Sequence, residues 1–407
     1  MLKALKPHIG IFGLRNVGKS SVVNFLSKQN TAIVSGIAGT TTDPVRKHIE
    51  LGKIGACVII DTAGIDDHGE LGEKRIKSTL ATINSCNLAI IVCDQQGINE
   101  HHKTLIELFQ KHHIPWFIVW NKIDLHFPTR SNIEDIDNCF LVPIILCSTI
   151  LQKGTVEIIE TIEKLLPEKS RKNSSIIGDL VNHGDLILLV TPIDQEAPKG
   201  RLITPQIQTI RDILDNDCMA VVLKERELDI FFKNYNIIPK LVITDSQAFL
   251  KVKGSIPTNI NMTSFSILFA RLKGNFEKMV EGTRYISKLE NNDPILIMES
   301  CSHHTTGDDI GRVKIPRWLK NFTGKKLNIT FLPGSDHLPT DLDYYKLVIQ
   351  CGGCMLTAKE MQSRLQPFID KNIAVTNYGM CIAYTLGVFE DSLKCFNTVT
   401  STNEDYL

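Results

Sequence analysis

The 407-residue sequence predicts an α/β protein: a parallel sheet with helices on both faces, followed by two smaller α/β domains. In the N-terminal part, short and uniformly apolar runs alternate with helical patterns, which is typical of a parallel sheet buried on both faces. Sparser runs of the same kind follow a polar, charged segment near residue 170, and more follow residue 260. We therefore expect three domains, at residues 1–168, 169–260 and 261–407.

The first apolar run ends at a glycine-rich loop, where a helix begins. The loop reads Gly13-x4-Gly18-Lys19-Ser20. Glycines let successive backbone N–H groups wrap around phosphates, while a lysine reaches the β- and γ-phosphates and a serine hydroxyl binds Mg²⁺. The other runs of the expected sheet are Ala56–Ile60, Leu88–Cys93, Trp116–Trp120 and Val142–Cys147, after His8–Phe12 as the first.

Further elements of a nucleotide site follow in order along the chain. Asp61, at the end of a strand, can hold the Mg²⁺ shell, and the Gly64 amide can meet a γ-phosphate. Thr41 offers a hydroxyl for the same Mg²⁺. We expect Ser20, Thr41 and Asp61 to bind Mg²⁺ and Lys19, Thr41 and Gly64 to serve catalysis.

Base recognition is expected from two later segments. The Asp124 carboxylate of Asn121-Lys122-Ile123-Asp124 can accept hydrogen bonds from guanine N1–H and the exocyclic amine, which adenine cannot supply. A second base contact is expected at Ser148 and Thr149. These features predict a GTPase. The expected nucleotide-binding residues are Gly13, Asn16, Val17, Gly18, Lys19, Ser20, Ser21, Asp61, Asn121, Lys122, Asp124, Ser148 and Thr149.

Residues 8–166 resemble the translation-factor-related GTPases of the TrmE/Era type. Ile65 stands where Ras-like enzymes carry a water-orienting glutamine. Asn16 matches the asparagine that binds K⁺ in potassium-activated relatives, although a loop-capping role explains it equally well. The resemblance implies slow, K⁺-stimulated GTP hydrolysis.

The middle domain offers no pattern that we can connect to a reaction. Strands are expected at Asp185–Thr191, Ala220–Lys224 and Lys240–Thr244, with helices at Pro205–Leu214 and Glu225–Asn234. Domains of this kind serve as assembly surfaces, and we expect the Asp185–Thr191 strand to be an exposed edge that could pair with its copy in a homodimer.

The last part of the chain carries three cysteines suited to a metal. Cys301 follows the expected strand Pro294–Met298, after a helix expected at about Ser264–Leu289, while Cys351 and Cys354 follow Leu347–Ile349 and precede a helix near Thr357. Three cysteines at two strand ends could hold a [4Fe–4S] cluster or, with His303 or His304, a zinc ion. A dithiol redox pair or buried core cysteines are further alternatives. The residues alone leave iron–sulfur and zinc equal.

The whole arrangement resembles the HydF family, the GTPase scaffolds of [FeFe]-hydrogenase maturation. The motifs Gly39–Val45, Leu189–Asp194 and Thr376–Gly379 support this. The resemblance implies a [4Fe–4S] cluster on Cys301, Cys351 and Cys354, and transfer of a diiron precursor from two radical-enzyme maturases to apo-hydrogenase. Gln350 replaces the family's second histidine, so the fourth ligand is expected to be His303, His304, Glu299, water or the precursor itself.

The composition limits the alternatives. Lys+Arg and Asp+Glu number 45 each, so no global charge indicates nucleic acid. No apolar stretch approaches the roughly 20 residues of a membrane span. Eleven scattered cysteines suit a reducing compartment, and we expect a cytoplasmic protein. The rival hypothesis is a TrmE/Era-like RNA-modification or ribosome-assembly GTPase with a structural zinc, whose basic surface would have to be Lys314, Arg317, Trp318 and Lys320.

Overall fold

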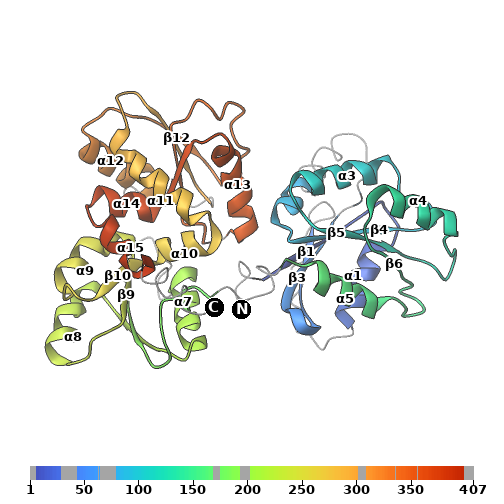
Figure 1. Ribbon diagram of the computed structural model, residues 1–407, viewed down its shortest axis with the longest axis horizontal. Helices are drawn as coiled ribbons and strands as arrows, with labels where there is room; N and C mark the ends of the chain where they lie inside the picture. The colour runs from blue at the N-terminus through green and yellow to red at the C-terminus, as the bar shows by residue number, and fades with distance from the viewer. Residues whose placement is uncertain are drawn as a thin grey trace, which may run out of the picture. The chain divides into compact units, whose positions relative to one another are not determined.

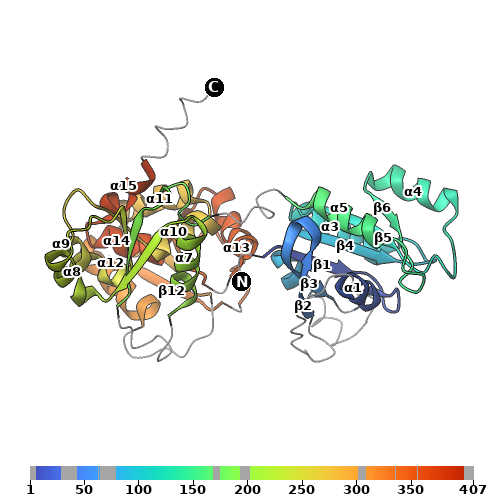
Figure 2. The ribbon, with the colours of Figure 1, turned by 90° about the horizontal axis from the view of Figure 1, so that it is seen from below.

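A computed structural model describes residues 6–28, 44–62, 64, 79–167, 175–192, 202–300, 309–334, 336–354 and 356–397. The chain divides into two compact units, residues 1–174 and 175–407. In each unit, helices surround the strands of central sheets (Figures 1 and 2). The predicted α/β fold class is confirmed.

One sheet forms the centre of the first unit. Its strands, in the spatial order β2-β3-β1-β4-β5-β6, are β1 (His8–Phe12), β2 (Val45–Leu51), β3 (Gly55–Asp61), β4 (Leu88–Cys93), β5 (Trp116–Trp120) and β6 (Ile144–Leu146). The helices are α1 (Lys19–Lys28), α3 (Glu100–Lys111), α4 (Arg130–Phe140) and α5 (Thr155–Leu165). Buried side chains of α1 and α5 lie on one face and those of α3 and α4 on the other.

The sheet is mixed, which corrects the expectation of a purely parallel one. Strand β2 pairs antiparallel with β3, from Val45 opposite Asp61 to Leu51 opposite Gly55. Its sequence is largely polar, and only Ile49 and Leu51 are buried. A half-buried edge strand lacks the continuous apolar run by which the five parallel strands were found.

The second unit holds two four-stranded sheets. The first has the order β10-β9-β7-β8 and the second β12-β11-β13-β14, and all their pairings are parallel. The strands are β7 (Leu186–Val190), β8 (Met219–Leu223), β9 (Leu241–Thr244), β10 (Asn261–Ser264), β11 (Pro294–Met298), β12 (Asn328–Leu332), β13 (Leu347–Gln350) and β14 (Ala374–Asn377). The helices are α7 (Thr204–Asp215), α8 (Leu228–Asn234), α9 (Phe249–Ser255), α10 (Phe265–Lys273), α11 (Phe276–Arg284), α12 (Ile315–Thr323), α13 (Ala358–Asp370), α14 (Tyr378–Thr385) and α15 (Phe389–Asn397).

Two expectations about this unit are wrong. Strand β7 lies inside its sheet, between β9 and β8, so it is not an exposed edge. Its run of Leu and Ile is buried because both faces are covered, whereas β8 forms the edge. The helix expected at Ser264–Leu289 is instead β10's last residue, α10, α11 and a 3-10 turn. Gly274 ends α10, and the Asn275 side chain caps α11 by accepting a hydrogen bond from the Lys278 amide.

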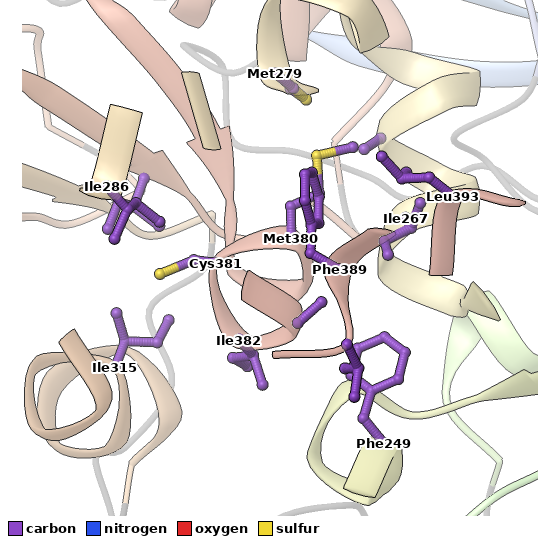
Figure 3. Close-up of a cluster of buried hydrophobic side chains, with 14 of the residues drawn as sticks. Phe249, Ile267, Met279, Ile286, Ile315, Met380, Cys381, Ile382, Phe389 and Leu393 are labelled. Carbon is purple, nitrogen blue, oxygen red and sulfur yellow. The ribbon is translucent and has the colours of Figure 1, made fainter. Parts of the chain in front are cut away.

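One hydrophobic core joins the two sheets of this unit. Figure 3 shows its centre, where α14 directs Met380, Cys381 and Ile382 toward different neighbours. Cys381 points toward Ile286 and Ile315 and is 1% exposed. The two sheets therefore share buried side chains, and the expected boundary between residues 260 and 261 stays a prediction. In the described ranges no helix has the length and apolar character needed to cross a membrane.

Candidate nucleotide and metal sites

The loop between β1 and α1 has the shape of a phosphate cradle. Gly13 and Gly18 have φ angles of 146° and 94°, in the region that disfavours side chains. A Cβ on Gly13 would lie 2.3 Å from the Val92 carbonyl oxygen, and one on Gly18 would lie 2.3 Å from Asn121 Nδ2. The sequence needs glycine at both positions because neighbouring strands approach the loop so closely.

Lys19 is enclosed by this loop. Its Nζ donates to the carbonyl oxygens of Gly13 and Leu14, at 3.1 and 2.6 Å, and the residue is only 8% exposed. A buried ammonium held by carbonyl oxygens is a charge placed to meet a phosphate.

Ser20 and Asp61 meet beside the cradle. Ser20 Oγ donates to Asp61 Oδ2 at 2.5 Å, although the residues are 41 apart in sequence. Burial raises the pKa of the Asp61 carboxyl, while the Ser20 hydrogen bond and Lys19 act to lower it. Asp61 Oδ1 is buried without a hydrogen-bond partner in the described residues. The Ser20 hydroxyl and the Asp61 carboxylate, whose Oδ1 is orphaned, form a donor set that suits Mg²⁺.

The base-recognition residues come from two strand ends. Asn121 Nδ2 donates to the Val17 carbonyl oxygen at 3.0 Å, which ties this segment to the phosphate loop. Ser148 Oγ donates to Asp124 Oδ1 at 2.5 Å and thereby orients the carboxylate. The structure thus brings the two predicted base-contact segments together.

Asp94 was missed by the sequence reasoning. Its carboxylate pairs with Lys122 Nζ at 2.9 Å, and Lys122 has a φ of 62°. Asp94 is 7% exposed and directly follows β4. The available signal was its place at the carboxyl end of a parallel strand, where the other site residues also lie.

For the other predicted site residues, the structure gives a position or an exposure but no contact, or does not describe them. Asn16 lies in the phosphate loop with a φ of 60°, Ser21 is exposed on α1, and Thr149 and Gly64 are partly exposed. Thr41, Ile65, Cys301, His303 and His304 lie outside the described residues. The same holds for the rest of residues 39–43 and for residues 65–75.

Two cysteines lie at one edge of the second sheet of the second unit. Strands β11 and β13 run parallel, with Met298 opposite Gln350. The Cys351 amide donates to the Met298 carbonyl oxygen at 2.8 Å, so Cys351 begins the loop at the ends of both strands. Cys351 and Cys354 are both half-buried. The expected pairing of strand ends is confirmed, while the convergence of Cys301 on this point stays a prediction.

Five further cysteines are core residues. Burial raises the pKa of the Cys57, Cys93, Cys147, Cys381 and Cys395 thiols to about 12. All five are at most 4% exposed. Cys351 and Cys354 differ from them in exposure and in lying on a loop.

Two cations lie near the cysteine loop, and the sequence reasoning missed both. Lys273, at the end of α10, is 0% exposed. Arg364, on α13, donates to the carbonyl oxygens of Gly334 and Glu299. Burial lowers the pKa of Lys273 to about 8 and also lowers that of Arg364, while the nearby cysteines act in the opposite direction. No sequence motif marks these cations, because they come from helices outside the cysteine loop.

Two residues near the cysteine loop, Glu299 and Gln350, form hydrogen bonds with other side chains. The Glu299 carboxylate, 5% exposed, accepts hydrogen bonds from Arg312 Nε and Nη2 at 2.6 and 2.9 Å. Binding a metal would require Glu299 to leave this ion pair, so its role as fourth ligand stays a prediction. Gln350 is fully buried and donates from Nε2 to Ser300 Oγ at 2.9 Å. Its amide braces the strand end, in keeping with a residue that does not bind iron.

The cysteine loop fits a cluster in its chemistry. Two thiols at adjacent strand ends supply soft ligands, and the buried Lys273 and half-buried Arg364 suit a negatively charged occupant. The described residues contain no group of three or more His, Cys, Asp or Glu able to hold a metal ion. Cys301, the third expected ligand, lies outside the described ranges.

Comparison with known proteins gives consistent results for the first unit. Residues 8–122 match the 50S ribosome-binding GTPase family. The chain is 31% identical over 189 residues to the tRNA modification GTPase MnmE of Prochlorococcus marinus strain MIT 9312, covering 44% of this chain and 41% of that protein. It is 39% identical over 120 residues to GTPase Der of Campylobacter jejuni strain RM1221, covering 28% of this chain and 26% of that protein. The chain thus spans less than half the length of these relatives.

Among solved structures, the chain is similar to a bacterial GTPase. Era of Aquifex aeolicus, solved as a Y63A variant bound to GDP and AlF4⁻, is 17% identical with a TM-score of 0.35, covering 53% of this chain and 92% of that one.

The second unit matches two further family models. Residues 176–274 match the hydrogen maturase F dimerization domain, and residues 277–395 match the hydrogen maturase F tetramerization domain. The two matches together cover more than half of the 407 residues and follow a GTPase match in the same chain. The chain therefore belongs to the hydrogen maturase F family.

Proposed function

We propose that this protein is a GTP-hydrolysing scaffold of [FeFe]-hydrogenase maturation that binds a [4Fe–4S] cluster and carries a diiron precursor to apo-hydrogenase. The observation that carries the proposal is the Cys351–Cys354 loop at the ends of β11 and β13, in a chain that matches the hydrogen maturase F models. Cys301, three residues beyond β11, would be the third ligand.

The cluster would supply an iron site at which the diiron cargo is held and released. Two features of the chain support an exchangeable fourth position. Gln350 is turned into the sheet toward Ser300, and Glu299 is paired with Arg312. We infer that His303, or the cargo itself, completes the site, with the two maturases and apo-hydrogenase as partners.

GTP hydrolysis would use the first unit. Lys19 would bind the β- and γ-phosphates, Ser20 and Asp61 would hold Mg²⁺, and Asp124 would select guanine. The proximity of Ser20 to Asp61, and of Ser148 to Asp124, supports these roles. Asn16 in the loop would bind K⁺, and replacing K⁺ by Na⁺ should slow hydrolysis while leaving GDP affinity nearly unchanged. Equal rates in both salts would remove the K⁺ role.

We infer that GTP biases contact with partner proteins and leaves the cluster ligands unchanged. The switch segments, about 36–45 and 61–75, would order around the γ-phosphate and relax after hydrolysis. Affinity for a partner maturase should therefore differ between the GTP-analogue and GDP forms. Equal affinities would contradict this coupling.

Homo-oligomer formation is supported by the names of both matched models, dimerization and tetramerization. Strand β8 is the edge where a second copy could add, since Met219 and Val222 are 56% and 42% exposed. A Val222→Lys change should shift the protein toward monomer in light scattering. An unchanged mass would place the interface elsewhere. We also propose a cytoplasmic location, because eleven cysteines scattered along the chain suit a reducing compartment.

The direct test of the proposed function is cargo transfer. Protein loaded by the two maturases should activate apo-hydrogenase, and Cys351→Ala and Cys354→Ala should abolish this activation. Cys139→Ala is the matched control, because Cys139 is an exposed thiol of the first unit. Transfer that is as efficient with the Cys351 and Cys354 variants would contradict the proposal.

A further inference from the structure

Lys273 forms hydrogen bonds to the backbone of the cysteine loop. Its Nζ donates to the carbonyl oxygens of Gly353 and Leu356, both at 2.9 Å, across a sequence separation of 80 residues or more. Gly353 lies between the two cysteines and has a φ of 62°. The Cys351 amide is bonded to Met298 at one end of the loop, and Lys273 is bonded to Gly353 and Leu356 farther along it.

Neither nearby cation has a carboxylate partner within ion-pair distance in the described part of the chain. Lys273 bonds to carbonyl oxygens and lies 5.2 Å from the centre of the Phe269 ring. Arg364 bonds to two carbonyl oxygens, and its Nε is buried without a hydrogen-bond partner. Glu360 contributes a weaker attraction to both, but its carboxylate accepts a hydrogen bond from the Thr357 amide at 2.7 Å.

Buried charges that lack a counter-charge are costly, so proteins retain them where an oppositely charged group binds. Among the acidic groups that attract these cations, Cys354 acts most strongly on Lys273 and Cys351 most strongly on Arg364. Thiolates bound to an iron–sulfur cluster make a site with net negative charge.

We propose that Lys273 and Arg364 are positioning residues for the cluster: Lys273 holds the Cys351–Leu356 loop in its binding shape, and the two cations together stabilise an anionic occupant. This inference rests on the proposed function, because it concerns the same cysteine site. It adds that the site selects by charge, and that its reduction potential is set in part by residues that do not touch the metal.

The sign of the effect on the potential follows from charge. Reduction adds one negative charge to the cluster, and a nearby cation stabilises that added charge. Removing a cation should therefore make the midpoint potential more negative. A residue with only a structural role would not shift the potential in a fixed direction.

The test uses full-length protein with anaerobically reconstituted iron and sulfide. Lys273→Met keeps much of the side-chain length and removes the charge, and Lys278→Met is the control because Lys278 is an exposed partner of Glu281 on α11. Lys273→Met should weaken iron retention against a chelator by roughly 10- to 100-fold, as outer-shell changes at metal sites do. Its remaining cluster should have a more negative midpoint potential in an EPR-monitored titration.

Arg364→Gln provides a second variant. Arg364 is less buried than Lys273, so we expect a smaller shift of the same sign and normal folding by circular dichroism. If Lys273→Met does not fold, the change in midpoint potential of the Arg364→Gln variant tests the inference in its place. Wild-type protein that binds iron, with unchanged retention and potential in these variants, would overturn this inference alone. Wild-type protein that binds no iron and sulfide would overturn the cluster assignment as well.

Discussion

The nucleotide site and the cysteine site are built in different ways from the same kind of sheet edge. In the first unit, the eight residues from Gly13 to Ser20 form the cradle for the phosphates, and Lys19 bonds to carbonyl groups within that same loop. In the second unit, the Cys351–Cys354 loop is held by Lys273, 80 residues away in sequence, and by the end of β11. A local motif can thus specify the first site, whereas the second depends on tertiary structure.

The largest expected effect breaks the first site and leaves the second intact. Lys19→Met should slow GTP hydrolysis by about 10²- to 10³-fold, the cost typical of removing one group that stabilises transition-state charge. Iron content after reconstitution should stay at the wild-type value. Phosphate release and iron analysis on the same sample measure both.

Lys103→Met serves as the control for this change. Lys103 lies on α3, is 53% exposed and pairs only with the neighbouring Glu100 in the described residues. A loss of hydrolysis in Lys103→Met equal to that in Lys19→Met would remove Lys19 from the catalytic set.

The next expected effect is a difference in alkylation between the cysteines of the loop and those of the hydrophobic cores. Raising a thiol pKa from about 9 to about 12 lowers the thiolate fraction roughly a thousandfold at neutral pH, and the thiolate is the reactive form. In native protein, Cys57, Cys93, Cys147, Cys381 and Cys395 should resist iodoacetamide, while Cys139, Cys351 and Cys354 should react. Peptide mass spectrometry measures each site.

Metal loading sharpens the same experiment. Reconstitution should protect Cys351 and Cys354 from alkylation and leave the exposed Cys139 reactive. Protection of Cys139 to the same degree would indicate a general loss of reactivity, and continued labelling of Cys351 would exclude it as a ligand.

A smaller effect is expected for base recognition. Asp124→Asn removes the charge that accepts the guanine hydrogen bonds, and hydrogen bonds to charged groups contribute about 1.5–3 kcal/mol each. GDP affinity should fall by about 10- to 100-fold, and the preference over ADP should shrink. Calorimetry would measure both, with the exposed Asp135→Asn on α4 as control. An unchanged preference for GDP would contradict the assignment of Asp124.

The smallest effect tests a local element within the second unit. The Thr357 hydroxyl accepts a hydrogen bond from the Glu360 amide, and the Glu360 carboxylate accepts one from the Thr357 amide, which caps α13. Thr357→Ala should lower the free energy of unfolding by about 1 kcal/mol. Ser363→Ala on the same helix is the control in chemical denaturation, and an equal loss there would show that the cap has no special role.

The sequence predicted the parts of the fold that rest on local patterns. Continuous apolar runs indicated β1, β4 and β5, and glycine spacing indicated the phosphate loop. The antiparallel β2 escaped because an edge strand buries only a few of its side chains. The break between α10 and α11 was not predicted because apolar residues keep a helical spacing across it, from Leu272 to Phe276. The capping contacts of Gly274 and Asn275 became visible only in the folded chain.

Long-range partners could not be predicted in the same way. Lys273 appears in the sequence as one of many lysines, and only the folded chain places it 2.9 Å from the Gly353 and Leu356 carbonyl oxygens. Asp94 likewise becomes a candidate site residue only when the structure shows its ion pair with Lys122. The pairing of Glu299 with Arg312, 13 residues away, likewise needed the structure.

The most direct test of the central claim, that one chain carries a GTPase site and an iron–sulfur site, is metal analysis of anaerobically reconstituted protein. About four irons and four sulfides per chain are expected, as a [4Fe–4S] cluster requires. An EPR signal should appear after dithionite reduction, and both should be lost in Cys301→Ala, Cys351→Ala and Cys354→Ala but not in Cys139→Ala. Tightly bound zinc, with no sulfide and no EPR signal, would contradict the account and favour a GTPase with a structural zinc site.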